Sequence, residues 1–306
     1  MTRIGADHPR AVWLWQAGFH RAIVCCEALS ELEAIDLQHL GREQSICCYR
    51  QGDVIIDPGP QVSSQRVIDA LGGEAPRAIL LTHIHLDHAA ATGALIELWP
   101  ETEVWVHERG APHVIDPERL IASATRIYGD EMARLWGTIL PVPAERVRVL
   151  SGDEEIGDWK LLYTPGHSGN HIAYLHEPTG TLFSGDVAGV RRLGGPVLAP
   201  TPPPEIDLAA WERSIELIEA VSPQRLAVTH FGVHDDVAEQ LSALRGDLER
   251  AAGWAQEAPD AETYAALQAE WLIGAADAET AAGYFAVMRS QDGYAGLKRA
   301  LLRREE

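Results

Sequence analysis

The stretch Thr82-His83-Ile84-His85-Leu86-Asp87-His88 decides the fold, because it gathers three histidines and one aspartate within seven residues. Residues 78–81 before it are apolar and partly β-branched, which indicates a buried strand. The alanine-rich run after it, residues 89–98, indicates a helix. We therefore expect the polar residues to lie in a loop at the carboxyl end of a strand, where layered α/β folds gather their functional sites.

The spacing within this stretch predicts metal ligands. His83 and His85 are two residues apart, so in an extended segment they point to the same side. Asp87 and His88 follow where the chain turns toward the helix, so they can face a second point nearby. Imidazole and carboxylate suit zinc, iron or manganese. One loop could thus offer two ligands to each of two metal ions. A polar loop with merely solvated histidines is disfavoured, because such a cluster rarely follows a buried strand by chance.

Polar residues also stand at the ends of three later candidate strands. His167 follows a strand expected over residues 159–163, at the tip of a Pro-Gly turn. Asp186 and His230 likewise each follow a short apolar strand. Any one of these residues alone would be interpreted as a turn residue. At successive strand ends, in this order, the interpretation as metal ligands is favoured.

The composition limits the classes of partner. The chain has 306 residues, of which 46% are hydrophobic and 23% charged, so it is globular and long enough for one large or two small domains. Its net charge of −20 repels phosphate backbones and anionic lipids, so we expect no nucleic acid and no membrane partner. We find no segment of membrane-spanning length and no secretory signal. Four cysteines in two vicinal pairs, Cys25-Cys26 and Cys47-Cys48, fit a reducing cytoplasm and are interpreted as core thiols.

The order of these segments resembles the metallo-β-lactamase superfamily, whose signature is His-x-His-x-Asp-His. The branches it is most similar to are glyoxalase II (hydroxyacylglutathione hydrolase) and the metallo-lactonases. The resemblance covers residues 32–234 and implies an α/β (α+β) fold, an αβ/βα sandwich of two mixed sheets with outer helices. We expect a catalytic domain over residues 31–236, after an N-terminal extension of uncertain structure over residues 1–30. Residues 237–306 are expected to form a helical C-terminal extension.

The resemblance also implies a ligand set for two divalent metal ions, with zinc favoured and iron or manganese as alternatives. It assigns one metal to His83, His85 and His167, the other to Asp87, His88 and His230, and Asp186 to a bridge between them. No organic cofactor is implied.

Two residues receive catalytic roles by the same resemblance. Asp87 would orient the attacking water or carry a proton to the leaving group. His171 would stabilise an oxyanion or support a ligand from behind. Asp57 matches a position that holds the metal loops by hydrogen bonds, and we leave it out of the ligand set.

The implied function is a dinuclear metal-dependent hydrolase of a small ester, thioester, lactone or phosphoester, with a metal-bridging hydroxide as the nucleophile. The alternative is a mononuclear iron-dependent oxidoreductase of the persulfide dioxygenase type, which needs only two histidines and one aspartate. A non-catalytic binding module is disfavoured by the complete ligand set. The substrate stays open, because the tail lacks a matching glutathione motif and no tyrosine closely follows Asp186.

Several segments allow more than one interpretation. His107 and His113 lack a metal motif, so surface or packing roles are favoured. Tyr128 and Trp136 could line a substrate groove, but their helical spacing favours core packing. The Pro/Gly-rich residues 194–204 form either a connection or a substrate-side lid. The C-terminal helices could cover the site or support a homodimer.

Overall fold

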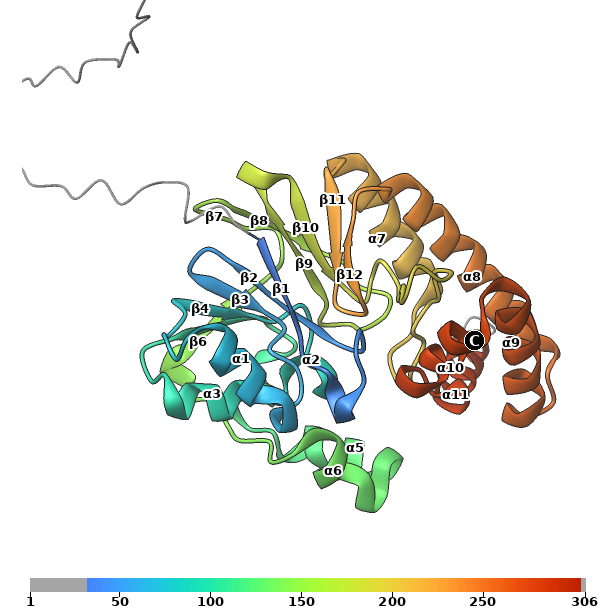
Figure 1. The fold of residues 1–306 in the computed structure, drawn as a ribbon, viewed down its shortest axis with the longest axis horizontal. Helices are drawn as coiled ribbons and strands as arrows, with labels where there is room; N and C mark the ends of the chain where they lie inside the picture. The colour runs from blue at the N-terminus through green and yellow to red at the C-terminus, as the bar shows by residue number, and fades with distance from the viewer. Residues whose placement is uncertain (1–31, 304–306) are drawn as a thin grey trace, which may run out of the picture.

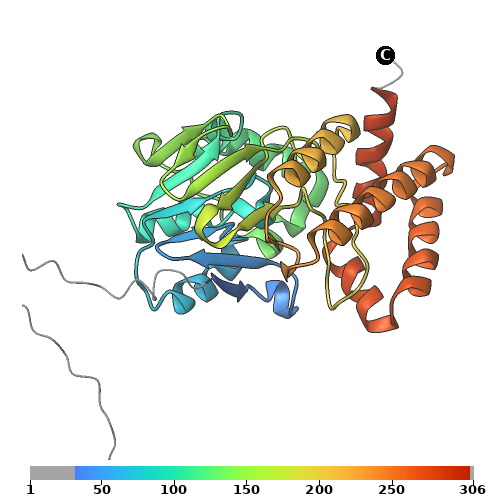
Figure 2. The ribbon, with the colours of Figure 1, turned by 90° about the horizontal axis from the view of Figure 1, so that it is seen from above.

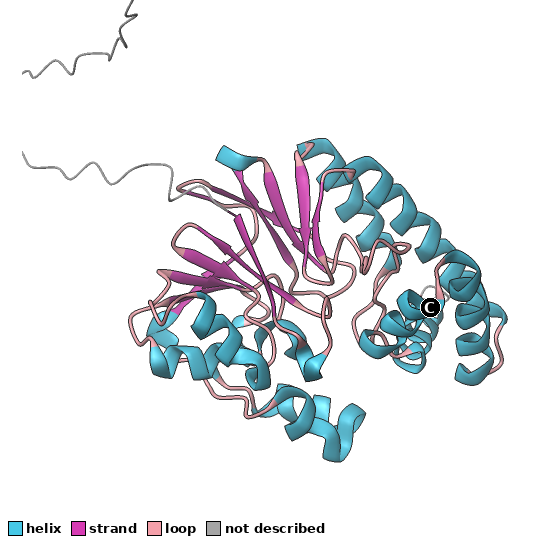
Figure 3. Ribbon diagram, viewed as in Figure 1, coloured by secondary structure: helices cyan, strands magenta, loops and turns pink. Residues whose placement is uncertain are grey.

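The computed structural model describes residues 32–303, so the expected extension over residues 1–30 and the Cys25-Cys26 pair lie outside the described residues. Two mixed sheets of six strands each face one another, with helices on their outer sides (Figure 1, Figure 3). Four helices follow the last strand and form a C-terminal extension. The predicted αβ/βα sandwich with a helical C-terminal extension is therefore confirmed.

The first sheet carries the histidine-rich stretch at the end of one of its central strands. Its strands, in spatial order, are β1 (Leu32–Asp36), β2 (Cys47–Gln51), β3 (Val54–Ile56), β4 (Ala78–Leu80), β5 (Glu103–His107) and β6 (Val147–Leu150). The pairs β1/β2 and β2/β3 are antiparallel, whereas β3 to β6 run parallel. Strands β3 and β4 consist of apolar residues that are all buried, as expected for parallel strands covered on both faces.

The second sheet places three strand ends at one edge. Its strands, in spatial order, are β12 (Gly232–His234), β11 (Arg225–Val228), β10 (Thr181–Gly185), β9 (Ile172–His176), β8 (Trp159–Tyr163) and β7 (Glu155–Ile156). Only β10 and β11 pair in parallel, and the other neighbours are antiparallel. Strands β8, β10 and β11 therefore run in the same direction. The backbone N–H of Ile172 donates to the carbonyl of Thr82 at 2.7 Å, which joins this edge to the end of β4.

The helices cover the outer faces of the sheets and one end of the sandwich. They are α1 (Ser64–Ala70), α2 (Leu86–Ala89), α3 (Thr92–Leu98), α4 (Ala111–Ile115), α5 (Glu118–Tyr128), α6 (Met132–Trp136), α7 (Leu208–Val221), α8 (Val237–Glu257), α9 (Ala261–Ala275), α10 (Ala278–Val287) and α11 (Ser290–Leu302). Helices α1 and α3 lie on the first sheet, α7 lies on the second, and α9 to α11 form a group at the side (Figure 1, Figure 2). No helix within residues 32–303 has both the length and the apolar character needed to cross a bilayer.

The element boundaries differ from expectation at three places. A one-turn helix, α2, already begins at Leu86, so Asp87 and His88 lie in a helical turn rather than in the loop before it. Tyr128 and Trp136, whose spacing indicated one helix, lie in the separate helices α5 and α6, because α5 ends at Gly129, which has a φ of +52°. The two short strands β7 and β12 were not predicted, because two or three residues carry too little alternation to be recognised.

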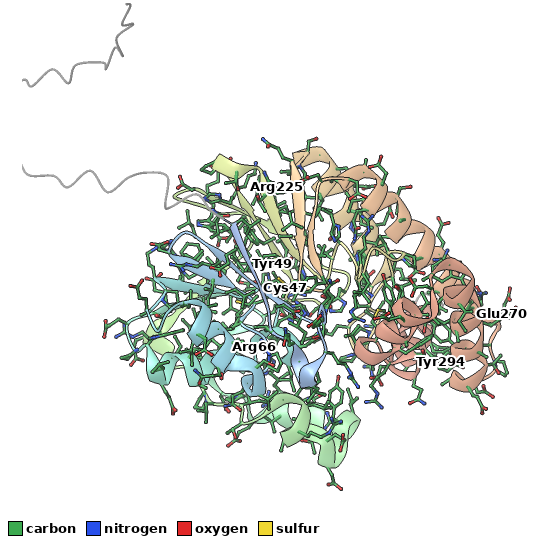
Figure 4. All side chains as sticks on the ribbon, viewed as in Figure 1. Cys47, Tyr49, Arg66, Arg225, Glu270 and Tyr294 are labelled. Carbon is green, nitrogen blue, oxygen red and sulfur yellow. The ribbon has the colours of Figure 1, made fainter. Side chains whose placement is uncertain are left out.

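The space between the sheets is filled by side chains from both. Cys47 and Tyr49 of β2 lie there (Figure 4), and the ring of Tyr49 meets Phe183 of β10 edge to face at 5.5 Å. Cys47 and Cys48 are fully buried free thiols, and burial raises the pKa of Cys47 to about 12. Their interpretation as core thiols is confirmed.

Candidate metal centre

Three histidine nitrogens from two strand ends converge on one point. His83 and His85 follow β4, and His167 follows β8. His85 Nδ1 lies 2.9 Å from His83 Nε2 and 2.9 Å from His167 Nε2. The three residues form one of the groups whose ligand atoms lie within 4.8 Å of one another. We call this group the first half-site.

A second group of ligand atoms lies beside the first. Asp87 and His88 come from α2, and His230 follows β11. Asp87 Oδ2 lies 3.3 Å from His230 Nε2 and 3.9 Å from His88 Nε2. We call these three residues the second half-site.

Asp186, directly after β10, stands between the two half-sites. Its Oδ2 lies 3.3 Å from His167 Nε2 of the first half-site. Its Oδ1 lies 3.3 Å from His88 Nε2 and 3.6 Å from His230 Nε2 of the second. The two oxygens of one carboxylate thus face different groups of imidazoles. The structure brings all seven sequence-predicted ligand residues together.

The rear nitrogens of the imidazoles are held by groups that fix their tautomers. His167 Nδ1 lies 2.8 Å from the carbonyl oxygen of Pro200, and His230 Nδ1 lies 2.7 Å from that of Ser45. A carbonyl oxygen only accepts hydrogen bonds, so both Nδ1 atoms carry the proton. The Nε2 lone pairs are therefore directed into the cluster, which is the arrangement that metal-binding histidines need.

Asp57 holds several of these elements from behind. Its fully buried carboxylate accepts hydrogen bonds from Thr82 N at 2.8 Å, Thr82 Oγ1 at 2.7 Å and Thr229 Oγ1 at 2.9 Å. It also accepts from His88 Nδ1 at 2.8 Å. Thr82 and Thr229 directly precede the ligands at the ends of β4 and β11. Asp57 thus ties the two sheets together at the cluster, as its resemblance to a loop-holding aspartate implied.

Two glycines allow the close approach of the loops. Gly185 has a φ of +49°, and a Cβ there would lie 2.5 Å from Thr82 Oγ1 and 2.8 Å from His171 Nε2. Gly166 has a φ of +142°, and a Cβ there would lie 2.4 Å from Trp211 Cα. Any side chain at either position would push a ligand-bearing loop away from its neighbour.

The electrostatics of the cluster match a cation site. Burial lowers the pKa of His83 and His85, and it lowers that of His167 to about 4, so these imidazoles are neutral. Burial alone would raise the pKa of Asp186, but His88, His230 and His167 outweigh it and hold that carboxyl ionised.

The second half-site has an excess of negative charge. Burial lowers the pKa of His88, but Asp186, Asp57 and Asp87 outweigh it and raise the pKa above its ordinary value. A proton on His88 and a metal cation would each neutralise the same carboxylates, so protonation of His88 competes with metal binding.

Two buried atoms in the cluster test whether the residues fit a metal. His88 Nε2 and Asp186 Oδ1 have no hydrogen-bond partner among the described residues, although both point into the cluster. A buried polar atom without a partner costs free energy, which a bound cation would remove. Imidazole nitrogens and carboxylate oxygens without thiolates suit zinc, iron or manganese. The residues present therefore fit divalent metal ions.

His171 lies behind the cluster and away from the open side. It is fully buried, its ring stacks on that of His83 with centroids 5.1 Å apart, and its Nδ1 lies 2.8 Å from Thr164 Oγ1. It is not among the residues that line the cavity described below. Of the two roles considered for His171, this position favours support of His83 over contact with a substrate oxyanion.

A cavity of about 240 Å³ opens above the cluster. Its floor includes His85, Asp87, Asp186 and His230. Helices α5 and α6 contribute mainly apolar wall residues: Leu120, Ser123, Ala124, Ile127, Tyr128, Leu135 and Trp136. The opposite wall includes residues 199–204 and residues of α9, the end of α10, the α10–α11 connection and α11. The cavity thus lies between the sandwich and its C-terminal extension.

The structure decides between the alternatives left open for three features. Tyr128 and Trp136 pack in a small apolar cluster and also line the cavity, so both interpretations, core packing and lining of a groove, apply to them. Part of the Pro/Gly-rich segment forms cavity wall, which favours the substrate side over a plain connection. His107 is buried and stacks on Tyr163 at 4.6 Å, which confirms packing.

Sequence reasoning missed His39 as a cavity residue. It lies in a short turn after β1, its ring stacks on Trp136 at 5.5 Å, and its Nε2 lies 2.7 Å from the carbonyl oxygen of Leu135. The contact joins the β1–β2 loop to α6 across the cavity wall. No motif surrounds His39, so no signal in the sequence could have identified it.

The chain is similar in sequence to known proteins. The profile of the Metallo-beta-lactamase superfamily matches residues 47–232. A metallo-beta-lactamase fold-containing protein of Sulfurisphaera tokodaii is 28% identical over 195 residues, which are 61% of this chain and 72% of that protein. Hydroxyacylglutathione hydrolase of Xanthomonas euvesicatoria is 30% identical over 135 residues, which are 44% of this chain but only 40% of that enzyme.

Solved structures show the same architecture. The structure of an archaeal metallo-beta-lactamase superfamily protein from Sulfolobus tokodaii has a TM-score of 0.61 at 25% identity and covers 72% of this chain and 86% of that one. A metallo-beta-lactamase family protein from Thermus thermophilus has a TM-score of 0.57 at 20% identity, with coverage of 90% and 93%, and shows the fold alone.

Proposed function

This chain belongs to the metallo-β-lactamase superfamily, and we propose that it is a dinuclear metal-dependent hydrolase of a small carboxylic ester, thioester or lactone. The observation that carries the proposal is the position of Asp186. Its two oxygens face the imidazoles of two different half-sites at 3.3 Å, as a carboxylate shared by two cations must. Zinc is our first choice of metal, with iron or manganese as alternatives.

In this proposal the first half-site, His83, His85 and His167, holds one ion, and the second, Asp87, His88 and His230, holds the other. When bound, the ions supply Lewis acidity, which polarises the scissile carbonyl and makes water nucleophilic near neutral pH. The buried rear contacts of the imidazoles keep the ligand nitrogens oriented throughout the reaction.

Asp87 is the group best placed to move a proton. It lies on the cavity floor, and its side chain is 27% exposed, compared with 4% for Asp186. Histidines of the second half-site hold its pKa well below the usual range despite burial, so its carboxylate is ionised and can accept a hydrogen bond from water. We propose that Asp87 orients the attacking water and passes its proton to the leaving group.

The cavity walls favour a substrate with an apolar group. Helices α5 and α6 line the cavity with aliphatic and aromatic side chains, and Val287 and Met288 lie on the opposite side. An apolar acyl chain or ring gains free energy on entering such a space, whereas a doubly charged phosphoester would lose hydration. For this reason carboxylic esters, thioesters and lactones are proposed ahead of phosphoesters.

The test is a reconstitution of metal-free protein with zinc, iron or manganese, followed by assays of aryl esters, lactones, thioesters and a phosphodiester. We expect hydrolysis of at least one carbonyl substrate, with activity that tracks occupancy of both half-sites. Asp87→Asn should abolish it, whereas Asp153→Asn, a change at an exposed loop residue, should not. Full activity with one iron per chain and consumption of oxygen would instead support the mononuclear oxidoreductase.

A further inference from the structure

A buried arginine lies between the C-terminal helices and the loop that supports His230. Arg192 is only 3% exposed. Its Nε donates to the carbonyl oxygen of Gln44 at 2.5 Å, and its Nη2 donates to that of Glu43 at 2.8 Å. Both carbonyls belong to the β1–β2 loop. A planar guanidinium with two directed bonds fixes the path of this loop.

The next residue in that loop is the one that orients a ligand of the second half-site. Ser45 presents its carbonyl oxygen to His230 Nδ1 at 2.7 Å. Gln44, directly before it, has a φ of +51°, which places a non-glycine residue in the left-handed region. Such a conformation persists only where surrounding contacts impose it. The two bonds from Arg192 are among these contacts, together with one from Gln44 N to Asp36 at 2.8 Å.

The other side of Arg192 is packed against α10. Its backbone N–H donates to Tyr284 Oη at 2.9 Å. A Cβ on Gly283 would lie 2.2 Å from Arg192 Nη1, so the helix backbone approaches the guanidinium more closely than any side chain would allow. Helix α10 and the β1–β2 loop therefore contact the same side chain from opposite sides.

We propose that Arg192 is a positioning residue through which the C-terminal helical extension sets the affinity of the second half-site. Helix α10 holds Arg192, Arg192 holds residues 43–45, and the Ser45 carbonyl holds the tautomer and orientation of His230. The inference rests on the proposed two-metal function, but its local claim concerns His230 alone. If the C-terminal helices served only as a cover or a dimer surface, replacing Arg192 would not change the orientation or the tautomer of His230.

The first half-site offers a matched comparison, because a different C-terminal residue supports it. Asp247 of α8 is 3% exposed and accepts a hydrogen bond from Ala199 N at 2.7 Å. The next residue, Pro200, presents its carbonyl oxygen to His167 Nδ1 at 2.8 Å. Loss of Asp247 should therefore disturb the first half-site, and loss of Arg192 the second.

The experiment is a zinc titration of metal-free full-length protein against a chelator of known affinity, with Arg192→Met and Asp247→Leu compared with wild type. Loss of a group that orients a metal ligand typically costs about 10–100-fold in affinity. We expect this loss at the second half-site in Arg192→Met, and at the first in Asp247→Leu. Equal losses at both half-sites in both variants, or no loss in either, would overturn the proposal.

A gentler variant and a metal-free measurement guard against simple unfolding. Gly283→Ala keeps Arg192 but presses a methyl group against its guanidinium, while alanine is the better helix former. We expect the second half-site to weaken although circular dichroism shows α10 intact. Asp186 and Asp87 raise the pKa of His230, so nitrogen NMR of metal-free protein is recorded at a pH high enough to make this ring neutral. It should then show His230 as a single Nδ1–H tautomer in wild type and as a mixture of tautomers in Arg192→Met. An unchanged His230 spectrum would refute the role of Arg192 even if no hydrolase activity were ever found.

Discussion

Replacing Asp57 by asparagine tests whether one buried carboxylate holds the metal loops together. Three hydrogen bonds reach Oδ2, from Thr82 Oγ1, Thr229 Oγ1 and His88 Nδ1, and one reaches Oδ1, from Thr82 N. An asparagine keeps a single oxygen. In the better orientation of the asparagine side chain, its oxygen keeps the three hydrogen bonds that reach Oδ2. The NH₂ group then faces the N–H of Thr82, which is also a donor.

The cost follows from these contacts. The Thr82 N–H and the new NH₂ group are then buried donors without an acceptor, and each costs about 1–3 kcal/mol. Loss of the charge also weakens each of the three remaining bonds by up to about 1 kcal/mol. These contributions are not additive, and removal of one partner from a buried pair typically costs about 3–5 kcal/mol. We therefore expect Asp57→Asn to lower the free energy of unfolding by about 3–5 kcal/mol.

Urea unfolding of metal-free protein measures this change, with Asp53→Asn as the matched control. Asp53 pairs with Arg77 at 2.8 Å, but its side chain is 57% exposed, so that variant should lose only about 0–1 kcal/mol. Zinc titration of Asp57→Asn should also show a weakened second half-site, because His88 loses a charged partner. A stability within about 1 kcal/mol of the control would show that Asp57 does not hold these loops together.

Three further changes probe the centre and its surroundings. Asp186→Asn should lose metal retention and activity together, since an amide cannot neutralise two cations, and normal turnover with both metals retained would reject the bridge. Gly185→Ala should lower the free energy of unfolding by at least about 2 kcal/mol. Gly157 has a similar positive φ but open space around it, so Gly157→Ala should cost only about 1 kcal/mol. Equal losses in the two variants would exclude the predicted clash. The third test uses a chain in which Cys25 and Cys26 are replaced by serine, so that only Cys47 and Cys48 can react. Both thiols are buried, and burial raises the pKa of Cys47 to about 12, so they should resist an aromatic disulfide reagent at pH 8 until urea unfolds the protein. Rapid labelling of the folded protein would contradict their burial.

The sequence predicted those parts of the centre that local patterns encode. His83, His85, Asp87 and His88 are neighbours in the chain and follow an apolar strand, so their convergence needs no knowledge of the distant fold. His230 stands alone, and its place was predictable only from the order of the motifs. In each case the strand before the residue supplied the signal.

The support behind the ligands could not be predicted. The carbonyl oxygens of Ser45 and Pro200 are backbone atoms, which every residue has, so no residue type reveals their role. Arg192 acts on a loop that is far away in the sequence, because 148 positions separate it from Gln44. His39 reaches the cavity only because the β1–β2 loop folds back onto α6. Such contacts depend on tertiary packing, which local periodicity does not record.

The number of tight metal sites in wild type and in His230→Ala tests the central claim most directly. His230 contributes only to the second half-site, so its removal should leave in place the imidazoles of the first half-site and the Asp186 oxygen, Oδ2, that faces them. Elemental analysis and zinc titration of reconstituted protein should give two tight sites in wild type and one in His230→Ala. One metal with full activity in wild type, or two undisturbed tight sites in His230→Ala, would contradict the two-metal account.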